Sequence, residues 1–207
     1  MTTETLLQTI VWAAIGFFVG SLMLAYWLGW LMLRSDVRAV GDGNPGATNV
    51  MKAGGAWVGV LALLLDIFKG AIPVSIAKYV IGLNGISLVI VALAPIFGHA
   101  FSPFLRFKGG KAFAVTGGVW IALTLWEVPT FGGIVLGIAF ALIEVSGWAV
   151  AYMFAIMGTY LAIAHPDPVL LAVMGVNVAV VLWKYRADLR QPIRPRPWLR
   201  RRLRMPA

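Results

Sequence analysis

The sequence contains no cysteine, only two histidines and few charged residues. Of its 207 residues, 12% are charged and 60% are hydrophobic. Soluble domains have about 25% charged and about 45–50% apolar residues, so this composition excludes a soluble globular domain and a disordered chain. The lack of cysteine excludes thiol catalysis, thiolate zinc sites and a disulfide framework, and two histidines are too few for most metal centres.

Long apolar runs fill most of the chain and predict an all-α, polytopic integral membrane protein with about seven transmembrane helices, some of them short or broken. A spanning helix needs about 20 mostly apolar residues, and the first run, 6–33, has no charged residue at all. This run is too long for a signal peptide, and no small-residue cleavage pattern follows it. Further runs cover 56–81, 86–104, 112–126, 131–144, 146–163 and 168–183.

The two short runs, 112–126 and 131–144, leave the number of full crossings open. They form either two spans or one broken or re-entrant hairpin, which would leave five full spans. Either number is odd, so the two termini lie on opposite sides of the membrane. We predict a single membrane domain over 1–207 that ends in a basic cytoplasmic tail at 184–207.

The positions of the basic residues predict the orientation of the chain. With the N-terminus outside, 15 of the 17 Lys and Arg residues lie on the inner side, as the positive-inside rule requires. The sequence therefore predicts a multi-pass protein of the cell (inner) membrane with a cytoplasmic C-terminus. We interpret the tail, which several prolines interrupt, as a topology and anionic-lipid anchor rather than a nucleic-acid-binding arm.

The first inner loop, 34–52, is rich in glycine. Gly41, Gly43 and Gly46 match the pattern G-x-G-x-x-G, but a membrane helix precedes them where a dinucleotide-binding fold requires a strand. Glycines still allow backbone amides to converge, and the start of the next helix adds its positive end. The loop is therefore suited to hold a phosphate group.

Polar side chains in the same loop support this interpretation. A tight turn in which Thr48 and Asn49 cap the next helix would explain only part of the loop. It would not explain why Asn44, Asn49, Arg38 and Lys52 occur together. We therefore prefer an anion-binding loop to a purely structural turn.

The second inner loop, 98–111, contains a Gly109–Gly110 pair between Lys108 and Lys111. Lysines that reach the membrane surface would explain the charges but not the glycines. The pair again offers free amides beside fixed positive charge. Two such loops on one face of the membrane predict a reaction of phosphorylated substrates, one of them a lipid.

These motifs resemble those of the bacterial acyl-phosphate:glycerol-3-phosphate acyltransferases, the PlsY family. The resemblance covers nearly the whole chain and is carried by Gly20-Ser21, Gly41–Asn49, Asp66-x-x-Lys69-Gly70, Gly98-His99 and Phe107–Lys111. It implies seven membrane helices, an outside N-terminus, and no metal or nucleotide cofactor. It also implies transfer of a fatty acyl group from acyl phosphate to the 1-hydroxyl of glycerol 3-phosphate, giving lysophosphatidic acid.

An acyl phosphate is already activated, so the residues need to position two substrates more than to supply a strong nucleophile. We expect catalytic roles for Lys111, Asn44, Asn49 and Asp42, with Lys111 and Lys52 contacting phosphate charge. The expected substrate contacts are Gly41, Gly43, Gly46, Thr48, Lys52, His99, Lys108, Gly109, Gly110, Arg38, Arg186 and Asp188. The expected partners are acyl phosphate, glycerol 3-phosphate and membrane lipid, with no nucleic acid, and the expected state is a monomer.

Two further expectations concern buried polar groups. His99 either orients the second loop or is a satisfied structural donor. Asp66 and Lys69 lie three residues apart on one helix, so we expect an internal ion pair that hides two charges in the bilayer and supports a loop.

The chain departs from the family pattern in the part associated with the acceptor. The family has Ser at the position of Asp42, and His, Glu and Asn at the positions of Tyr185, Ala187 and Asp188. The two aspartates would repel an anionic acceptor unless they face away, pair with arginine or stay protonated. Two alternatives therefore stay open: another hydroxyl acceptor, or a non-catalytic lipid-binding or transport relative.

The predicted topology can be tested by labelling. A cysteine introduced at Thr3 should react with an impermeant maleimide from outside, and one at Pro206 only from the cytoplasmic side. The native chain has no cysteine, so it serves as the unlabelled control. Labelling of both positions from the same side would contradict an odd number of spans.

Overall fold

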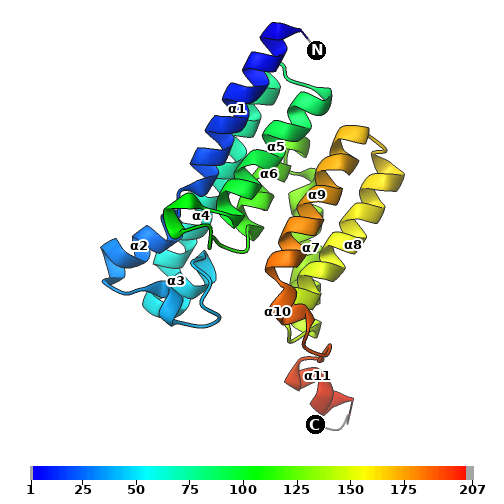
Figure 1. Cartoon of the computed structure of the whole chain (residues 1–207). Helices are drawn as coiled ribbons and strands as arrows, with labels where there is room; N and C mark the ends of the chain where they lie inside the picture. Colours follow the sequence, from blue (N-terminus) through cyan, green and yellow to red (C-terminus); the bar gives the residue numbers. More distant parts are fainter. Residues whose placement is uncertain (1, 204–207) are drawn as a thin grey trace. The chain divides into compact units, whose positions relative to one another are not determined.

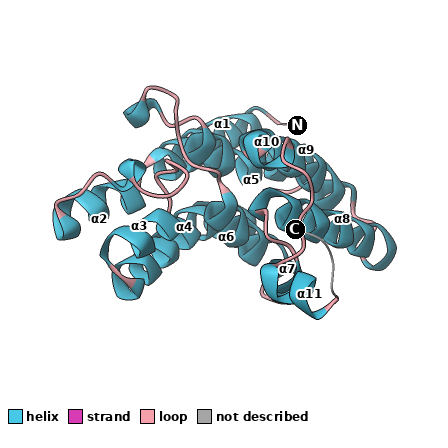
Figure 2. Cartoon of the chain, turned by 90° about the horizontal axis from the view of Figure 1, so that it is seen from below, coloured by secondary structure: helices cyan, strands magenta, loops and turns pink. Residues whose placement is uncertain are grey.

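The computed structural model describes residues 2–203, which form helices joined by loops (Figures 1 and 2). Within this range, seven apolar helical stretches correspond one for one to the predicted runs. Four are long and apolar enough to cross a membrane: Thr3–Leu33, Ala56–Val80, Gly85–Leu105 and Ser146–Ala164. Three are shorter: Phe113–Thr124, Glu127–Leu142 and Pro168–Lys184. The prediction of an all-α membrane protein is confirmed.

The chain divides into two compact parts, 1–125 and 126–207, which are described separately. In the first part, α1 packs along α5, while α4 packs along α6 and also contacts α1, α2 and α3. The helices are α1 Thr3–Ser21, α2 Leu24–Leu33, α3 Ala47–Gly54, α4 Ala56–Ser75, α5 Gly85–Ala100 and α6 Phe113–Thr124. Short 3₁₀ turns cover Val37–Ala39 and Pro103–Leu105, and a π-helical turn, Ile76–Val80, extends α4.

Small residues bring α1 and α5 into backbone contact. A Cβ atom at Gly20 would collide with the backbone of Pro95, and one at Gly98 would collide with the backbone of Phe17. Glycine at such contacts is a usual means of close helix packing in membranes. Beyond the end of α5, the Ser102 hydroxyl donates a hydrogen bond of 2.7 Å to the Ser21 carbonyl. The second loop is thus attached to the end of α1.

The first apolar run is not one continuous helix, although the sequence predicts a single stretch over 6–33. The chain becomes extended at Leu22, with φ −63° and ψ 116°, between α1 and α2. No glycine or proline occupies the break. Instead, the Lys69 ammonium donates a hydrogen bond of 2.6 Å to the Leu22 carbonyl. This partner satisfies a carbonyl that the break would otherwise leave unpaired.

The expected ion pair between Asp66 and Lys69 is confirmed. The Lys69 Nζ atom lies 2.7 Å from the Asp66 Oδ1 atom, and both side chains are only 2% exposed. Both residues are on α4. The pair therefore fixes α4 to the junction of α1 and α2, which is the supporting role that the sequence predicts.

The described residues of the second part, 126–203, contain five helices. In this part, α8 packs against α7 and α9, and α10 packs against α8 and α9. Their bounds are α7 Glu127–Leu142, α8 Ser146–Ala164, α9 Pro168–Lys184, α10 Arg186–Leu189 and α11 Pro197–Arg202. The Asp167 side chain caps the start of α9 and Pro168 is its first residue, which is the usual chemistry of a helix N-terminus.

The two short runs form separate helices, α6 and α7. The number of full crossings, the single membrane domain and the role of the tail stay predictions.

The buried pair on α4 generates a stability test. Replacing Lys69 by Met leaves the Asp66 carboxylate buried without its partner, which costs about 3–5 kcal/mol. The double variant Asp66→Leu/Lys69→Met removes both charges and should recover most of this loss. The free energy of unfolding, measured for the single and the double variant in detergent, tests both expectations. An equally large loss in the double variant would contradict the ion-pair explanation.

Candidate active site

The first loop turns back over the start of α3. Gly41 and Gly43 have φ values of +64° and +74°, in the left-handed region that favours glycine. A Cβ atom at Gly41 would lie 3.0 Å from the Lys52 Nζ atom. The Lys52 ammonium therefore lies close over the loop, as expected for a residue that contacts an anion bound there.

Asn49 ties this loop together. Its buried side-chain amide donates hydrogen bonds of 2.9 Å to the Asp42 carboxylate and 2.9 Å to the Asn44 carbonyl. The N-cap of α3 is Gly46, and it makes no side-chain capping bond. The alternative in which Thr48 and Asn49 cap the helix is therefore wrong. Thr48 is exposed in the first turn of α3.

The second loop is built around His99. The buried His99 accepts a hydrogen bond of 3.1 Å from the Gly110 amide on its carbonyl oxygen. A Cβ atom at Gly109 would collide with this carbonyl, and one at Gly110 would collide with the His99 ring. The glycine pair is thus required for packing, and the Gly110 amide is not free for phosphate as the sequence suggested. His99 holds the loop in place, while the Lys108 side chain is exposed.

Lys111 joins the two loops. Its Nζ atom lies 2.9 Å from the Asp42 Oδ2 atom, and its backbone amide donates a hydrogen bond of 3.1 Å to the Asn44 side-chain oxygen. The Asp42 carboxylate also accepts the Asn44 backbone amide at 3.1 Å. We call the three donors to this carboxylate, from Asn44, Asn49 and Lys111, the anion cradle.

The cradle holds an ionised carboxylate. Burial works against the charge of Asp42, but the Lys111 ammonium, the Asn44 backbone amide and the Asn49 side-chain amide outweigh it and lower the pKa of Asp42 below its ordinary value. The Asp42 side chain is 46% exposed and that of Lys111 is 16% exposed, so the cradle opens to solvent. Asp42 is thus neither protonated nor paired with arginine; its partner is Lys111.

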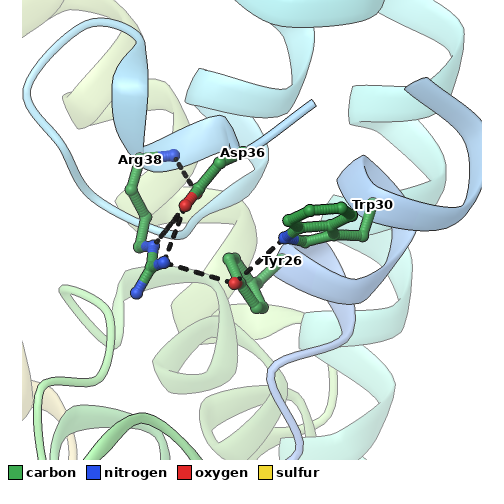
Figure 3. A network of polar contacts seen from close by, with 4 residues as sticks. All are labelled: Tyr26, Trp30, Asp36 and Arg38. Carbon is green, nitrogen blue, oxygen red and sulfur yellow. Dashed lines mark hydrogen bonds and ion pairs between the residues drawn. The ribbon is translucent and has the colours of Figure 1, made fainter. Parts of the chain in front are cut away.

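The Arg38 guanidinium is engaged by Asp36 and Tyr26 (Figure 3). Its guanidinium forms an ion pair of 2.7 Å with Asp36, donates to the Tyr26 hydroxyl at 3.2 Å and lies over the Tyr26 ring. Hydrogen bonds from Arg38 lower the pKa of the Asp36 carboxyl. The guanidinium is thus held by Asp36 and Tyr26, and the expected phosphate contact of Arg38 stays a prediction. Asp36 precedes the turn as an N-cap, a local signal that could have identified this pairing.

The C-terminal motif lies in the second part of the chain. The Arg186 guanidinium lies over the Trp183 ring, 4.3 Å from its centroid, and donates to the Trp183 carbonyl at 3.0 Å. The Asp188 carboxylate accepts the Ser146 hydroxyl at 2.7 Å at the start of α8, where negative charge is favourable. Tyr185 is buried and Ala187 is exposed. Asp188 thus has a structural partner within its own part.

Metal ligands do not cluster in the part of the chain that the structure describes, since no three His, Cys, Asp or Glu side chains come together there. The fold and the cradle define a class of protein: a helical integral membrane protein in which two loops converge on one carboxylate. Comparison with known proteins narrows this class. The family model for glycerol-3-phosphate acyltransferase matches residues 10–194. The chain belongs to this family, and it is a membrane acyltransferase.

Individual relatives agree with this assignment. A glycerol-3-phosphate acyltransferase of Anaeromyxobacter sp. (strain Fw109-5) is 34% identical over 197 residues, covering 93% of this chain and 96% of the relative. One from Maridesulfovibrio salexigens is 34% identical over 184 residues, 88% of this chain and 92% of the relative. The crystal structure of PlsY (YgiH) in its glycerol 3-phosphate form has a TM-score of 0.81 at 30% identity and covers 88% of this chain and 90% of that one.

Proposed function

We propose that the chain transfers a fatty acyl group from acyl phosphate to the 1-hydroxyl of glycerol 3-phosphate, producing lysophosphatidic acid for phospholipid synthesis. In this reaction, the hydroxyl oxygen attacks the acyl carbon and the bond from that carbon to the phosphate oxygen breaks. Phosphate leaves with the electron pair, and the hydroxyl proton passes to it. The related PlsY structures are described as a glycerol 3-phosphate form and a lysophosphatidic acid form, which supports this substrate and product.

The anion cradle is the observation that carries the proposal. Asn44 and Asn49 of the first loop and Lys111 of the second converge on a single carboxylate. Asn44 and Lys111, which join the two loops, are 67 residues apart in the sequence. Donors fixed in this way can hold a phosphate group and favour its departure without reorganising during the reaction. The donor phosphate would take the place of the Asp42 carboxylate, and the nearby Lys52 would add a second positive charge.

The side chains divide these tasks. Lys111 and Lys52 supply charge, and Asn44 and Asn49 supply oriented hydrogen bonds. The glycines allow close packing: Gly41 lies against Asn49, and Gly109 and Gly110 lie against His99. Lysine at position 52 provides a point charge rather than the bidentate grip of an arginine. We further propose that the protein works as a monomer in the inner membrane, with its N-terminus outside and the loops on the cytoplasmic side.

The first activity test uses two variants, one that removes a positive charge from the cradle and one that obstructs it with a side chain. Lys111→Ala removes an anion contact, and Gly46→Leu places a side chain against the Asn44 amide, which lies 2.7 Å from the position of a Cβ atom. Loss of one oriented donor costs about 100- to 1,000-fold in turnover, so both variants should lose nearly all transfer from palmitoyl phosphate.

Matched controls separate loss of chemistry from loss of folding. Gly133→Leu on α7 places the same side chain where a Cβ atom meets nothing within 4 Å, and Arg201→Ala removes an exposed charge on α11. Both should retain activity. Unaltered turnover in Lys111→Ala and Gly46→Leu would refute the role of the cradle.

Asp42 provides the second activity test. Next to a phosphate dianion, its carboxylate can cost more than about 1 kcal/mol at an effective dielectric constant of about 20. Asp42→Ser should therefore lower the KM for glycerol 3-phosphate, roughly tenfold for each 1.4 kcal/mol of repulsion removed. Initial rates with a panel of hydroxyl acceptors, analysed for acylated products, measure this effect.

The same panel distinguishes an alternative acceptor. If the native acceptor is a neutral or cationic alcohol, Asp42 binds it, and Asp42→Ser should reduce activity towards that alcohol while raising activity towards glycerol 3-phosphate. Asp42→Ser therefore raises activity towards the native acceptor in the first case and lowers it in the second. Unchanged kinetics with every acceptor would show that Asp42 lies outside the reacting site.

A further inference from the structure

The C-terminal segment is fixed to the C-terminal end of α7. The last carbonyl groups of a helix have no partner within it. Arg196 donates from its backbone amide to the Leu142 carbonyl at 2.8 Å and from its Nε atom to the Phe140 carbonyl at 2.8 Å. The Trp198 indole donates to the Ala141 carbonyl at 2.9 Å. The tail thus supplies partners for three carbonyls in the last turn of α7.

Three more contacts hold the same segment in place. The Glu144 amide donates to the Arg194 carbonyl at 2.9 Å, and the Trp148 indole donates to the Gln191 carbonyl at 2.9 Å. Arg200 lies 3.2 Å from the Glu144 carboxylate. The segment from Gln191 to Arg200 is therefore attached in a defined position, which a tail that acts only by its charge would not need.

An apolar groove in this part of the chain reaches the fixed segment. Its volume is about 400 Å³, within the range of about 300–1,000 Å³ that is usual for small-ligand sites. Ile193 of the tail lines it together with side chains of α7 and α8. The other lining residues are Val135, Ile138, Ala139, Leu142, Ile143, Tyr152 and Ile156. Several of these side chains, such as Ile138 at 58% and Ile193 at 48%, are well exposed.

The segment that carries Ile193 also carries two exposed arginines. Arg190 and Arg194 flank Ile193 in the sequence, and both are exposed. The four acids in the described range 126–203 are used elsewhere: Glu127 by Tyr160 and His165, Glu144 by Arg200, Asp167 by the start of α9, and Asp188 by Ser146. An anion from outside the chain is therefore the natural partner of these two guanidinium groups.

We propose that this groove and the two arginines form a binding site for an anionic phospholipid of the bilayer. One acyl chain lies along α7 and α8 against Ile138, Ile156 and Ile193, and Arg190 and Arg194 contact the phosphate of the head group. Apolar side chains beside basic ones at a membrane surface match the two ends of such a molecule. The site is separate in its residues from the anion cradle and does not depend on the acyl-transfer reaction.

The test measures lipid binding rather than activity. The full chain, purified in neutral detergent, is titrated with dioleoyl-phosphatidylglycerol and, as the head-group control, dioleoyl-phosphatidylcholine, with bound lipid counted by native mass spectrometry. The wild type should prefer the anionic lipid. The double variant Arg190→Gln/Arg194→Gln should bind it roughly tenfold or more weakly. The matched variant Arg201→Gln/Arg202→Gln, with the same loss of charge on α11, should bind as the wild type does.

A second pair of variants tests the groove. Val135→Trp fills it and should reduce binding of the anionic lipid, whereas Ile134→Trp, at a neighbouring exposed position outside the lining, should not. Equal loss of lipid binding in both arginine variants would mean that the tail attracts the lipid only by its overall charge, and would overturn the site. Unchanged lipid binding in Val135→Trp would overturn the proposed contact between the acyl chain and the groove. Because the readout is bound lipid, it does not depend on whether a variant still acylates glycerol 3-phosphate.

Discussion

Every polar backbone group inside a bilayer needs a partner within the protein, and the described structure follows this constraint at the break after α1 and at the ends of α5 and α7. The break after α1 exposes the Leu22 carbonyl, and Lys69 donates to it. A charged lysine at this depth needs a counter-ion, which Asp66 provides from the same helix. One broken helix therefore requires a buried ion pair, and that pair in turn fixes α4 to the segment that leads into the first loop.

The same constraint acts at the other helix ends and shapes the loops. His99 and the glycine pair pack so closely that side chains at positions 109 and 110 would collide with neighbouring atoms. This packing carries Lys111 to Asn44 and Asp42. At the end of α7, side chains of the tail take over the final carbonyls. Helix termination and site formation are thus consequences of one physical requirement.

The family assignment and the unusual Asp42 are compatible in the proposed site, because donors that hold a carboxylate are also suited to a phosphate oxygen. Lys111, Asn49 and Asn44 donate to the oxygen atoms of the Asp42 carboxylate, and charge-assisted hydrogen bonds form with carboxylates and with phosphates. The proposed donor site therefore requires the substrate phosphate to displace the Asp42 carboxylate. In that proposal, phosphate binding competes with the ion pair between Asp42 and Lys111.

The sequence alone determined the membrane class, the seven apolar stretches and the two loops, because hydrophobic length and glycine-rich polar clusters are local properties of the chain. It also identified Asp66 and Lys69 as a pair, since they are one helical turn apart. Only the tertiary structure decided that Lys111 faces Asp42, that Tyr26 contacts Arg38, and that Gly110 serves the packing of His99. These contacts join segments whose approach depends on how α1, α4 and α5 pack. The break at Leu22 has the same origin, because its partner Lys69 lies 47 residues away and no local residue marks it.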